Sequence, residues 1–176
     1  MKQHLAVSAI GSDRAGLVHE FTRTIADCGG SIAESRMLAL GTEYGLQLLV
    51  AGNWAAIAKI EAELARLAES LGVIVQLRRT EARPRREDQL PYTVDVVCVE
   101  QPGIVSGLTG FFTSRQVEIG EVSTRSYIAP QTGASMSSVQ MSINVPTRIH
   151  ISQLREDFLD YCDSLNLDAI LEPIKN

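Results

Sequence analysis

The residues best suited to chemistry lie at two glycine-containing turns. The first turn is Gly11-Ser12-Asp13-Arg14-Ala15-Gly16-Leu17 and the second is Val99-Glu100-Gln101-Pro102-Gly103-Ile104. Unpaired backbone N–H groups at a helix start form a partly positive site that suits a carboxylate, and a glycine lets a ligand approach the backbone closely. The alternative is structural: the glycines only make the turn, Asp13 or Gln101 caps the helix, and Pro102 is its first residue.

The two turns belong to a duplication with a fixed offset of 87 residues. Gly103 falls on Gly16, and the stretch from residue 5 to residue 34 needs no gap to match its counterpart. Apolar residues meet apolar residues along this stretch, as Leu17 meets Ile104. Copies of about 80 residues are too long for solenoid repeats and long enough for separate small folds.

Each copy predicts the same order of elements. Alternation predicts strands, and apolar spacings of three and four predict helices. The first copy gives a strand at 4–10, a helix at 16–28, strands at 31–40 and 44–52, a helix ending at 71 and a strand at 73–77. The second gives a strand at 92–99, a helix at 103–115, strands at 117–127 and 136–145, a helix at 151–165 and a strand at 167–171.

This order is that of the ferredoxin-like class. We therefore expect an α+β fold with two βαββαβ domains, each an antiparallel four-stranded sheet with two helices on one face. The expected boundaries are 1–80 for the first domain, 81–90 for an Arg-rich linker and 91–176 for the second domain.

Composition indicates a globular, cytoplasmic chain. The hydrophobic fraction is 45% and the aromatic fraction 5%, which favours aliphatic cores. No apolar stretch approaches the length of a membrane span, so no membrane partner is expected. Cys28, Cys98 and Cys162 are widely spaced and odd in number, as expected of buried thiols in a reducing compartment.

Charge argues against direct binding to nucleic acid. Residues 1–89 are neutral overall and residues 90–176 carry the whole net charge of −5, whereas phosphate binding calls for a basic surface. The sequence has one basic cluster, which consists of Arg78, Arg79, Arg83, Arg85 and Arg86. This cluster fits a solvated linker, with a docking patch for an acidic partner as the second interpretation and a nucleic-acid contact as the third.

The sequence offers no catalytic or metal-binding pattern, so we expect a protein that is not an enzyme and needs no cofactor. His4, His19 and His150 lie in different predicted elements and lack the spacing of a metal site or catalytic triad. Phosphate-loop and dinucleotide fingerprints are also missing from the sequence.

The first turn resembles the opening of an ACT domain, a small regulatory module that often binds amino acids. The resemblance rests on Asp13-Arg14-Ala15-Gly16-Leu17 followed by Gly29-Gly30-Ser31-Ile32, and in the second copy on Gln101-Pro102-Gly103-Ile104 followed by Val117-Glu118-Ile119. It covers residues 3–79 and 90–174. Two such copies without a catalytic domain are similar to the glycine cleavage system transcriptional repressor family.

The resemblance implies ligand sites between two modules, where the turn before the first helix faces the second strand of a neighbour. The matching positions are Asp13, Arg14, Gly16 and Ser31 in the first copy, and Gln101, Gly103 and Glu118 in the second. Ala15 replaces the family's proline, Ser31 and Glu118 replace its asparagine, and Gln101 replaces its arginine. The first copy thus keeps the charge better and the second copy keeps the shape better.

The family suggests a non-enzymatic regulator that senses a small amino acid, with glycine as the family's suggestion, forms homo-oligomers and represses genes of glycine cleavage or related metabolism. No basic recognition helix is visible, so transcriptional control would act through a DNA-binding transcription regulator. Two alternatives stay open. One is a ligand-free interaction scaffold, and the other is a stand-alone regulatory subunit of an amino-acid-metabolising enzyme.

Overall fold

The structure is a computed structural model that describes residues 2–84 and 86–174. It divides into two compact units, Met1–Pro84 and Arg85–Asn176. The division falls within the segment 81–90, and the last two residues of that segment, Gln89 and Leu90, already pair as part of a strand. Arg85 and the terminal residues 1, 175 and 176, which were included in the expected linker and domains, lie outside the described residues.

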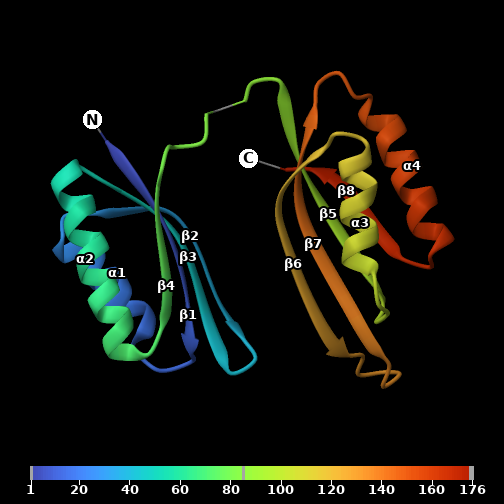
Figure 1. Cartoon of the computed structure of the whole chain (residues 1–176). Coiled ribbons are helices and arrows are strands. Elements are labelled where there is room, and N and C mark those ends of the chain that lie inside the picture. Colours follow the sequence, from blue (N-terminus) through green and yellow to red (C-terminus); the bar gives the residue numbers. More distant parts are fainter. Residues whose placement is uncertain (1, 85, 175–176) are drawn as a thin grey trace. The chain divides into compact units, whose positions relative to one another are not determined.

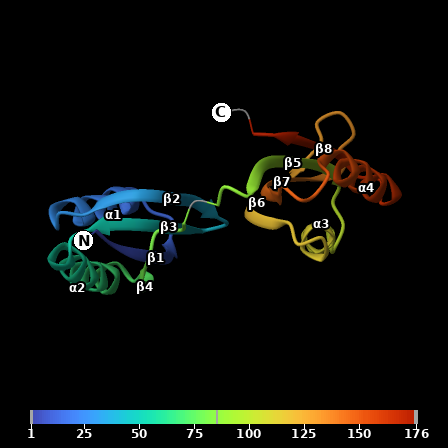
Figure 2. The ribbon, with the colours of Figure 1, turned by 90° about the horizontal axis from the view of Figure 1, so that it is seen from above.

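The first unit is an antiparallel four-stranded sheet with both helices on one face (Figures 1 and 2). Its strand order is β2-β3-β1-β4. The elements are β1 (Gln3–Ser12), α1 (Leu17–Asp27), β2 (Ser31–Leu40), β3 (Glu43–Gly52), α2 (Trp54–Leu71) and β4 (Ile74–Thr80).

The second unit repeats this architecture with the strand order β6-β7-β5-β8 (Figure 1). Its elements are β5 (Gln89–Val99), α3 (Ile104–Ser114), β6 (Glu118–Ile128), β7 (Ser135–Pro146), α4 (Ile151–Ser164) and β8 (Asp168–Pro173). The fold class expected from the duplication is therefore confirmed in both units.

Periodicity explains why these segments fold as they do. Every second residue of β1, namely Leu5, Val7 and Ala9, is buried on the helix-covered face. The stripe of α1 supplies Leu17, Phe21 and Ile25 to the same core. Each unit has its own core, so the sheet positions between the buried ones form a second face that no helix of the unit covers.

The second core is built around aromatic rings. Phe111, Phe112, Phe158 and Tyr161 bring α3 and α4 together, with ring centroids between 5.0 and 5.3 Å apart. The Arg115 guanidinium lies 3.8 Å from the centroid of the Phe111 ring. Such pairs add to the stabilisation that burial alone provides.

A register shift recurs at matching positions of the two sheets. It lies between Ile32 and Glu34 in β2, and between Ile119 and Glu121 in β6. A β-bulge bends its strand and changes which face a side chain occupies. The duplication thus preserved a detail of the backbone as well as the hydrophobic pattern.

Two arginines of the basic cluster pair with carboxylates and stay about half exposed. Arg79 donates two hydrogen bonds to Glu61, of 3.0 and 2.7 Å. Arg86 donates to Glu118 at 3.0 Å, Arg83 also has an interaction, and Arg85 lies outside the described residues. The interpretation of this cluster as a docking patch for an acidic partner stays a prediction.

Three further observations bear on function. The three cysteines are buried and unpaired. Among the described residues no cluster of His, Cys, Asp and Glu could hold a metal ion. No helix in residues 2–84 and 86–174 is both long and apolar enough to cross a membrane.

Candidate functional site

The turn from β1 to α1 owes its shape to one glycine. Gly16 immediately precedes the helix with φ +90° and ψ −13°, a left-handed conformation that side-chain-bearing residues rarely adopt. No side chain caps the helix, so the expectation that Asp13 caps it is wrong. The backbone N–H of Asp13 instead donates to the carbonyl of Thr42 at 2.9 Å, which ties the turn to the β2–β3 hairpin.

The start of α1 leaves backbone donors open. Within the described residues, the N–H groups of Val18 and His19 make no backbone hydrogen bond, whereas that of Glu20 donates to the Gly16 carbonyl at 2.9 Å. Because the side-chain cap is missing too, these donors face solvent or a ligand. They are the partly positive site expected from the sequence.

A hollow of about 430 Å³ lies at this helix start, and we call it the β1–α1 hollow. Its lining combines donors, a carboxylate and apolar groups: Asp13, Arg14, Gly16, Leu17, Val18, His19, Thr22 and Tyr44. The volume is in the range of small-molecule sites. Three of the predicted positions, Asp13, Arg14 and Gly16, therefore come together here.

Arg14 is oriented by an ion pair across the turn. Its Nη2 donates to Oε1 of Glu20 at 2.7 Å, with side-chain exposures of 41% and 34%. A guanidinium carries five N–H donors, so this one bond leaves others able to reach a carboxylate. The hollow thus offers positive groups from Arg14 and the helix start and a negative group from Asp13, a combination that suits a zwitterion.

Sequence reasoning missed several residues of the hollow. Val18, His19 and Thr22 follow Gly16 within the first turns of α1, so helical spacing could have found them. Tyr44 arrives from β3, where it pairs with Gly11 of β1. Only the strand register brings it to the turn, so no local motif could have indicated it.

The second turn has a similar backbone and different side chains. Gly103 has φ +89°, and α3 begins at Ile104 without a side-chain cap. Gln101 therefore does not cap the helix, and Pro102 lies two residues before it instead of occupying its first position. The turn is held by Glu100, whose N–H donates to the Ser135 carbonyl at 2.9 Å and whose Oε1 accepts from Ser126 at 3.1 Å.

Ser31 and Glu118 lie at the opposite ends of their sheets from these turns. Ser31 pairs with Ala51, which pairs with His4 near the start of β1, while the turn follows its end at Ser12. A strand of this length spans roughly 30 Å. No single unit can therefore join Ser31 to the β1–α1 hollow, and their meeting across two modules stays a prediction.

Glu118 already has a cationic partner. Its carboxylate accepts from Arg86 at 3.0 Å, with side-chain exposures of 28% and 57%. Register places Glu118 beside Asn144, far from Gly103 along the sheet. A ligand ammonium at Glu118 would have to share the carboxylate with the guanidinium.

The comparisons with known proteins agree with this architecture. Residues 3–78 match the family model of the ACT domain. The chain is 29% identical over 173 residues to the glycine cleavage system transcriptional repressor of Escherichia coli (strain K12), covering 98% of this chain and 91% of that protein. The corresponding Shigella flexneri protein gives the same values.

Two solved structures share the fold over the whole chain. A crystal structure assigned to a glycine cleavage system transcriptional repressor superposes with a TM-score of 0.72 and 27% identity, covering 100% of this chain and 99% of that one. An unknown protein from Galdieria sulphuraria gives a TM-score of 0.79 at 23% identity, covering 99% and 100%, and supports the fold alone. Residues 3–78 thus match the ACT domain, and the chain is similar over nearly its whole length to glycine cleavage system transcriptional repressors.

Proposed function

We propose that this chain is a non-enzymatic regulator that binds a small amino acid in its first unit and represses amino-acid metabolism genes through protein contacts. The observation that carries the proposal is the similarity to the Escherichia coli repressor over 98% of the chain. The β1–α1 hollow supports it, since it offers both signs of charge in a small volume. Glycine and serine are the first ligands to test.

The two turns are not equivalent as ligand sites. Arg14 has Gln101 as its counterpart in the second copy, so the cation is lost. Ser137 is the counterpart of Tyr44, because it pairs with Cys98 as Tyr44 pairs with Gly11. The second turn therefore lacks the tyrosine ring as well. We therefore place the amino acid in the first unit, with its carboxylate near Arg14 and the start of α1 and its ammonium toward Asp13.

Occupancy changes regulation by linkage. A ligand shifts an equilibrium between two arrangements only by its difference in affinity for them. If a neighbouring module completes the site with the residue at its second strand, then binding favours the assembled arrangement. The output is a change in the surface offered to a partner, which we take to be a DNA-binding regulator in the cytoplasm.

Calorimetry tests the ligand. Glycine and serine are titrated first, followed by the other common amino acids. Arg14→Gln should weaken binding by about 10-fold or more, since a hydrogen bond to a charged group contributes about 1.5–3 kcal/mol. The matched control is Arg66→Gln, which removes an exposed arginine whose Nη1 donates to Glu63 at 2.9 Å on α2. Equal weakening by both variants would contradict the site.

Capture experiments test the output. The chain is used as bait with and without the ligand, and the proposal expects a DNA-binding regulator whose recovery depends on the ligand. Recovery of an amino-acid-metabolising enzyme would indicate a regulatory subunit. In the calorimetric titrations, the absence of heat with every amino acid would indicate a ligand-free scaffold. A shift of promoter DNA by the chain alone would contradict control through a partner.

A further inference from the structure

A hollow of about 440 Å³ lies in the second unit between α4 and the edge strand β8, and we call it the α4–β8 hollow. Its lining combines one cation with apolar groups and one carboxylate: Arg155, Leu159, Ala169, Ile170, Leu171, Glu172 and Pro173. The volume is in the range of small-molecule sites. The lining shares no residue with that of the β1–α1 hollow, so the α4–β8 hollow is a separate candidate site.

The duplication identifies the matching positions in the first unit. The buried stripes of the two helices have the same spacing: Ile60, Leu64 and Ala68 in α2, and Leu154, Phe158 and Cys162 in α4. Strand register agrees with this match, since Leu171 of β8 takes the place of Leu77 of β4. Residues 60–79 of the first unit therefore correspond to residues 154–173 of the second.

This correspondence shows that the first unit has an ion pair where the second has the hollow. Glu61 accepts two hydrogen bonds from Arg79, of 3.0 and 2.7 Å, which join α2 to β4. In the second unit Arg155 takes the place of Glu61 and reverses its charge. Pro173 takes the place of Arg79 and brings no charge. A closed pair in one copy therefore corresponds to a single cation in the other.

Arg155 is oriented by the backbone of β8. Its Nε donates to the carbonyl oxygen of Leu171 at 3.1 Å, a partly buried contact. In the part of the chain that the structure describes, no carboxylate pairs with this guanidinium. A guanidinium has five N–H donors, and the bond from Nε leaves both Nη groups able to hold the two oxygens of one carboxylate.

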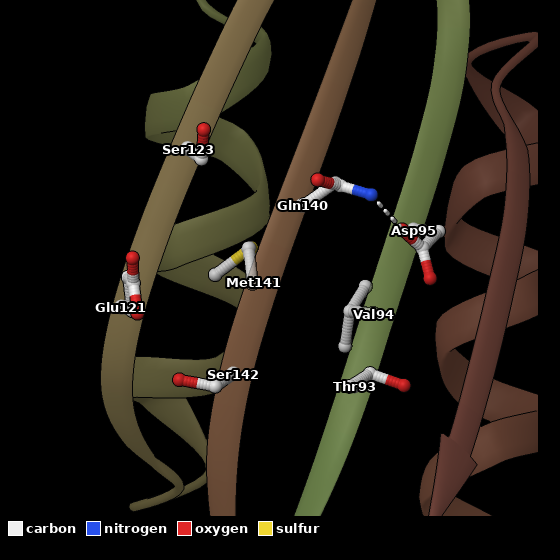
Figure 3. Close-up of a pocket in the computed structure, with 8 residues that line it drawn as sticks. All are labelled: Thr93, Val94, Asp95, Glu121, Ser123, Gln140, Met141 and Ser142. Atoms are coloured by element: carbon white, nitrogen blue, oxygen red, sulfur yellow. Dashed lines mark hydrogen bonds between the residues drawn. The ribbon is translucent and has the colours of Figure 1, made fainter. Parts of the chain in front are cut away.

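The carboxylates nearest to the hollow point to the other face of the sheet. Side chains alternate along a strand, so Glu172 points away from the face on which Leu171 is buried. Asp95 of β5 also lies on the uncovered face, where it accepts from Gln140 at 3.0 Å (Figure 3). The helix side of the hollow is therefore cationic and apolar. Such a lining suits a carboxylate with an apolar chain, and an added ammonium group would lose water there at a cost.

We propose that the α4–β8 hollow binds a small carboxylic acid with an apolar chain. Its carboxylate pairs with Arg155, and its chain packs on Leu159 and Ala169. The ligand differs in class from that of the β1–α1 hollow, where Asp13 can receive an ammonium group. The proposal does not depend on the amino-acid site of the first unit.

An NMR titration of the full chain with isocaproate, which is leucine without its amino group, tests the proposal. Isocaproate should shift the amide signals of Leu159 and of residues 169–172 until they saturate. Leucine keeps the chain and adds the ammonium group, and isocaproamide keeps the chain and lacks the negative charge. Each should bind at this site about 10-fold more weakly or less, because a hydrogen bond to a charged group is stronger than a neutral one and an unpaired charge is costly to bury.

A charge-removing variant locates the binding. Arg155→Gln should weaken the binding of isocaproate about 10-fold or more, since the ligand loses its charged partner. The matched control is Arg125→Gln, which removes an exposed arginine of β6 in the same unit and should leave the binding unchanged. Circular dichroism establishes that each variant is folded.

A second variant closes the hollow with charges already used by the chain. Arg155→Glu combined with Pro173→Arg places the charges of the first-unit pair Glu61 and Arg79 at the corresponding positions of the second unit. Because the first unit folds with this pair, the double variant should fold as well. Its binding of isocaproate should be at least as weak as that of Arg155→Gln.

Three results would overturn the proposal. The first is the absence of a saturable shift at Leu159 and residues 169–172 with isocaproate. The second is equal weakening by Arg155→Gln and Arg125→Gln in folded variants, which would indicate a general effect of charge. The third is binding of leucine at this site as tight as that of isocaproate, which would contradict the class of ligand.

Discussion

The glycines of α3 allow one chemical change to be tested at two backbone conformations. Gly103 precedes the helix with φ +89°, and Gly110 lies within it on an exposed turn. A Cβ added at either position would meet no atom within 4 Å. Substitution by alanine therefore differs between the two sites in backbone conformation and not in packing.

The expected effects have opposite signs. Gly103→Ala forces a side chain into the left-handed region and should destabilise the second unit by about 1–2 kcal/mol. Gly110→Ala gains helix propensity and restricts the unfolded chain, which should stabilise the unit by about 1 kcal/mol. The free energies of unfolding of the two variants should thus differ by about 2–3 kcal/mol.

Gly107 provides a third variant for which sterics decide. A Cβ there would lie 2.6 Å from the hydroxyl oxygen of Tyr161, whose ring packs 5.2 Å from that of Phe111. Gly107→Ala must push this tyrosine aside, so its gain in helix propensity is offset by strain. Its stability should fall below that of Gly110→Ala.

Hydrogen exchange separates the two units in one experiment. Amides of β7 report opening of the second unit, and those of β3 in the first unit serve as an internal reference. Protection of β7 should differ between Gly103→Ala and Gly110→Ala by roughly 30- to 140-fold, the equivalent of the expected free-energy difference. Shifts of the same sign in both variants would refute the backbone argument.

Three further outcomes are expected. Phe21→Ala removes a fully buried ring and should cost the first unit about 3–5 kcal/mol, measured by urea unfolding with Trp54 fluorescence. Burial raises the pKa of Cys162 from 9.0 to about 11. The contribution of the neutral thiol to the free energy of unfolding should therefore be complete below pH 9 and be lost as pH rises towards 11. Cys162→Ala should reduce this loss of stability with rising pH. The hydrogen bond from Arg79 lowers the pKa of Glu61 below 4.5. This pair therefore stabilises the fold above pH 4.5, and its contribution to the free energy of unfolding is lost as pH falls further. Arg79→Gln should raise the pKa of Glu61, measured as the midpoint of its NMR titration.

The fold was predictable because its signals are local and occur twice. The helix expected at 16–28 spans Leu17–Asp27, and the strand expected at 31–40 spans Ser31–Leu40. Apolar periodicity decides which face of an element is buried, and glycines mark the starts of α1 and α3 and the end of α2. The main difference is at β5, which starts at Gln89 instead of Tyr92 because pairing with β7 extends it.

The candidate site was predictable only in part. Asp13, Arg14 and Gly16 are neighbours in sequence, so a motif could identify them as a group. The capping role expected for Asp13 was wrong because Gly16 directly precedes the helix and no side chain caps it. Tyr44 was missed because register, and not sequence proximity, brings it to the hollow.

The sequence alone determined the duplication, the order of elements and the two glycine-dependent helix starts, since each follows from local conformation and periodicity. Tertiary structure decided which distant residues meet. It paired Arg86 with Glu118, separated Ser31 from the β1–α1 hollow by the length of a sheet, and aligned Ile10 of β1 with Ile74 of β4. These contacts depend on strand register and side-chain packing, which are set only when the whole sheet assembles.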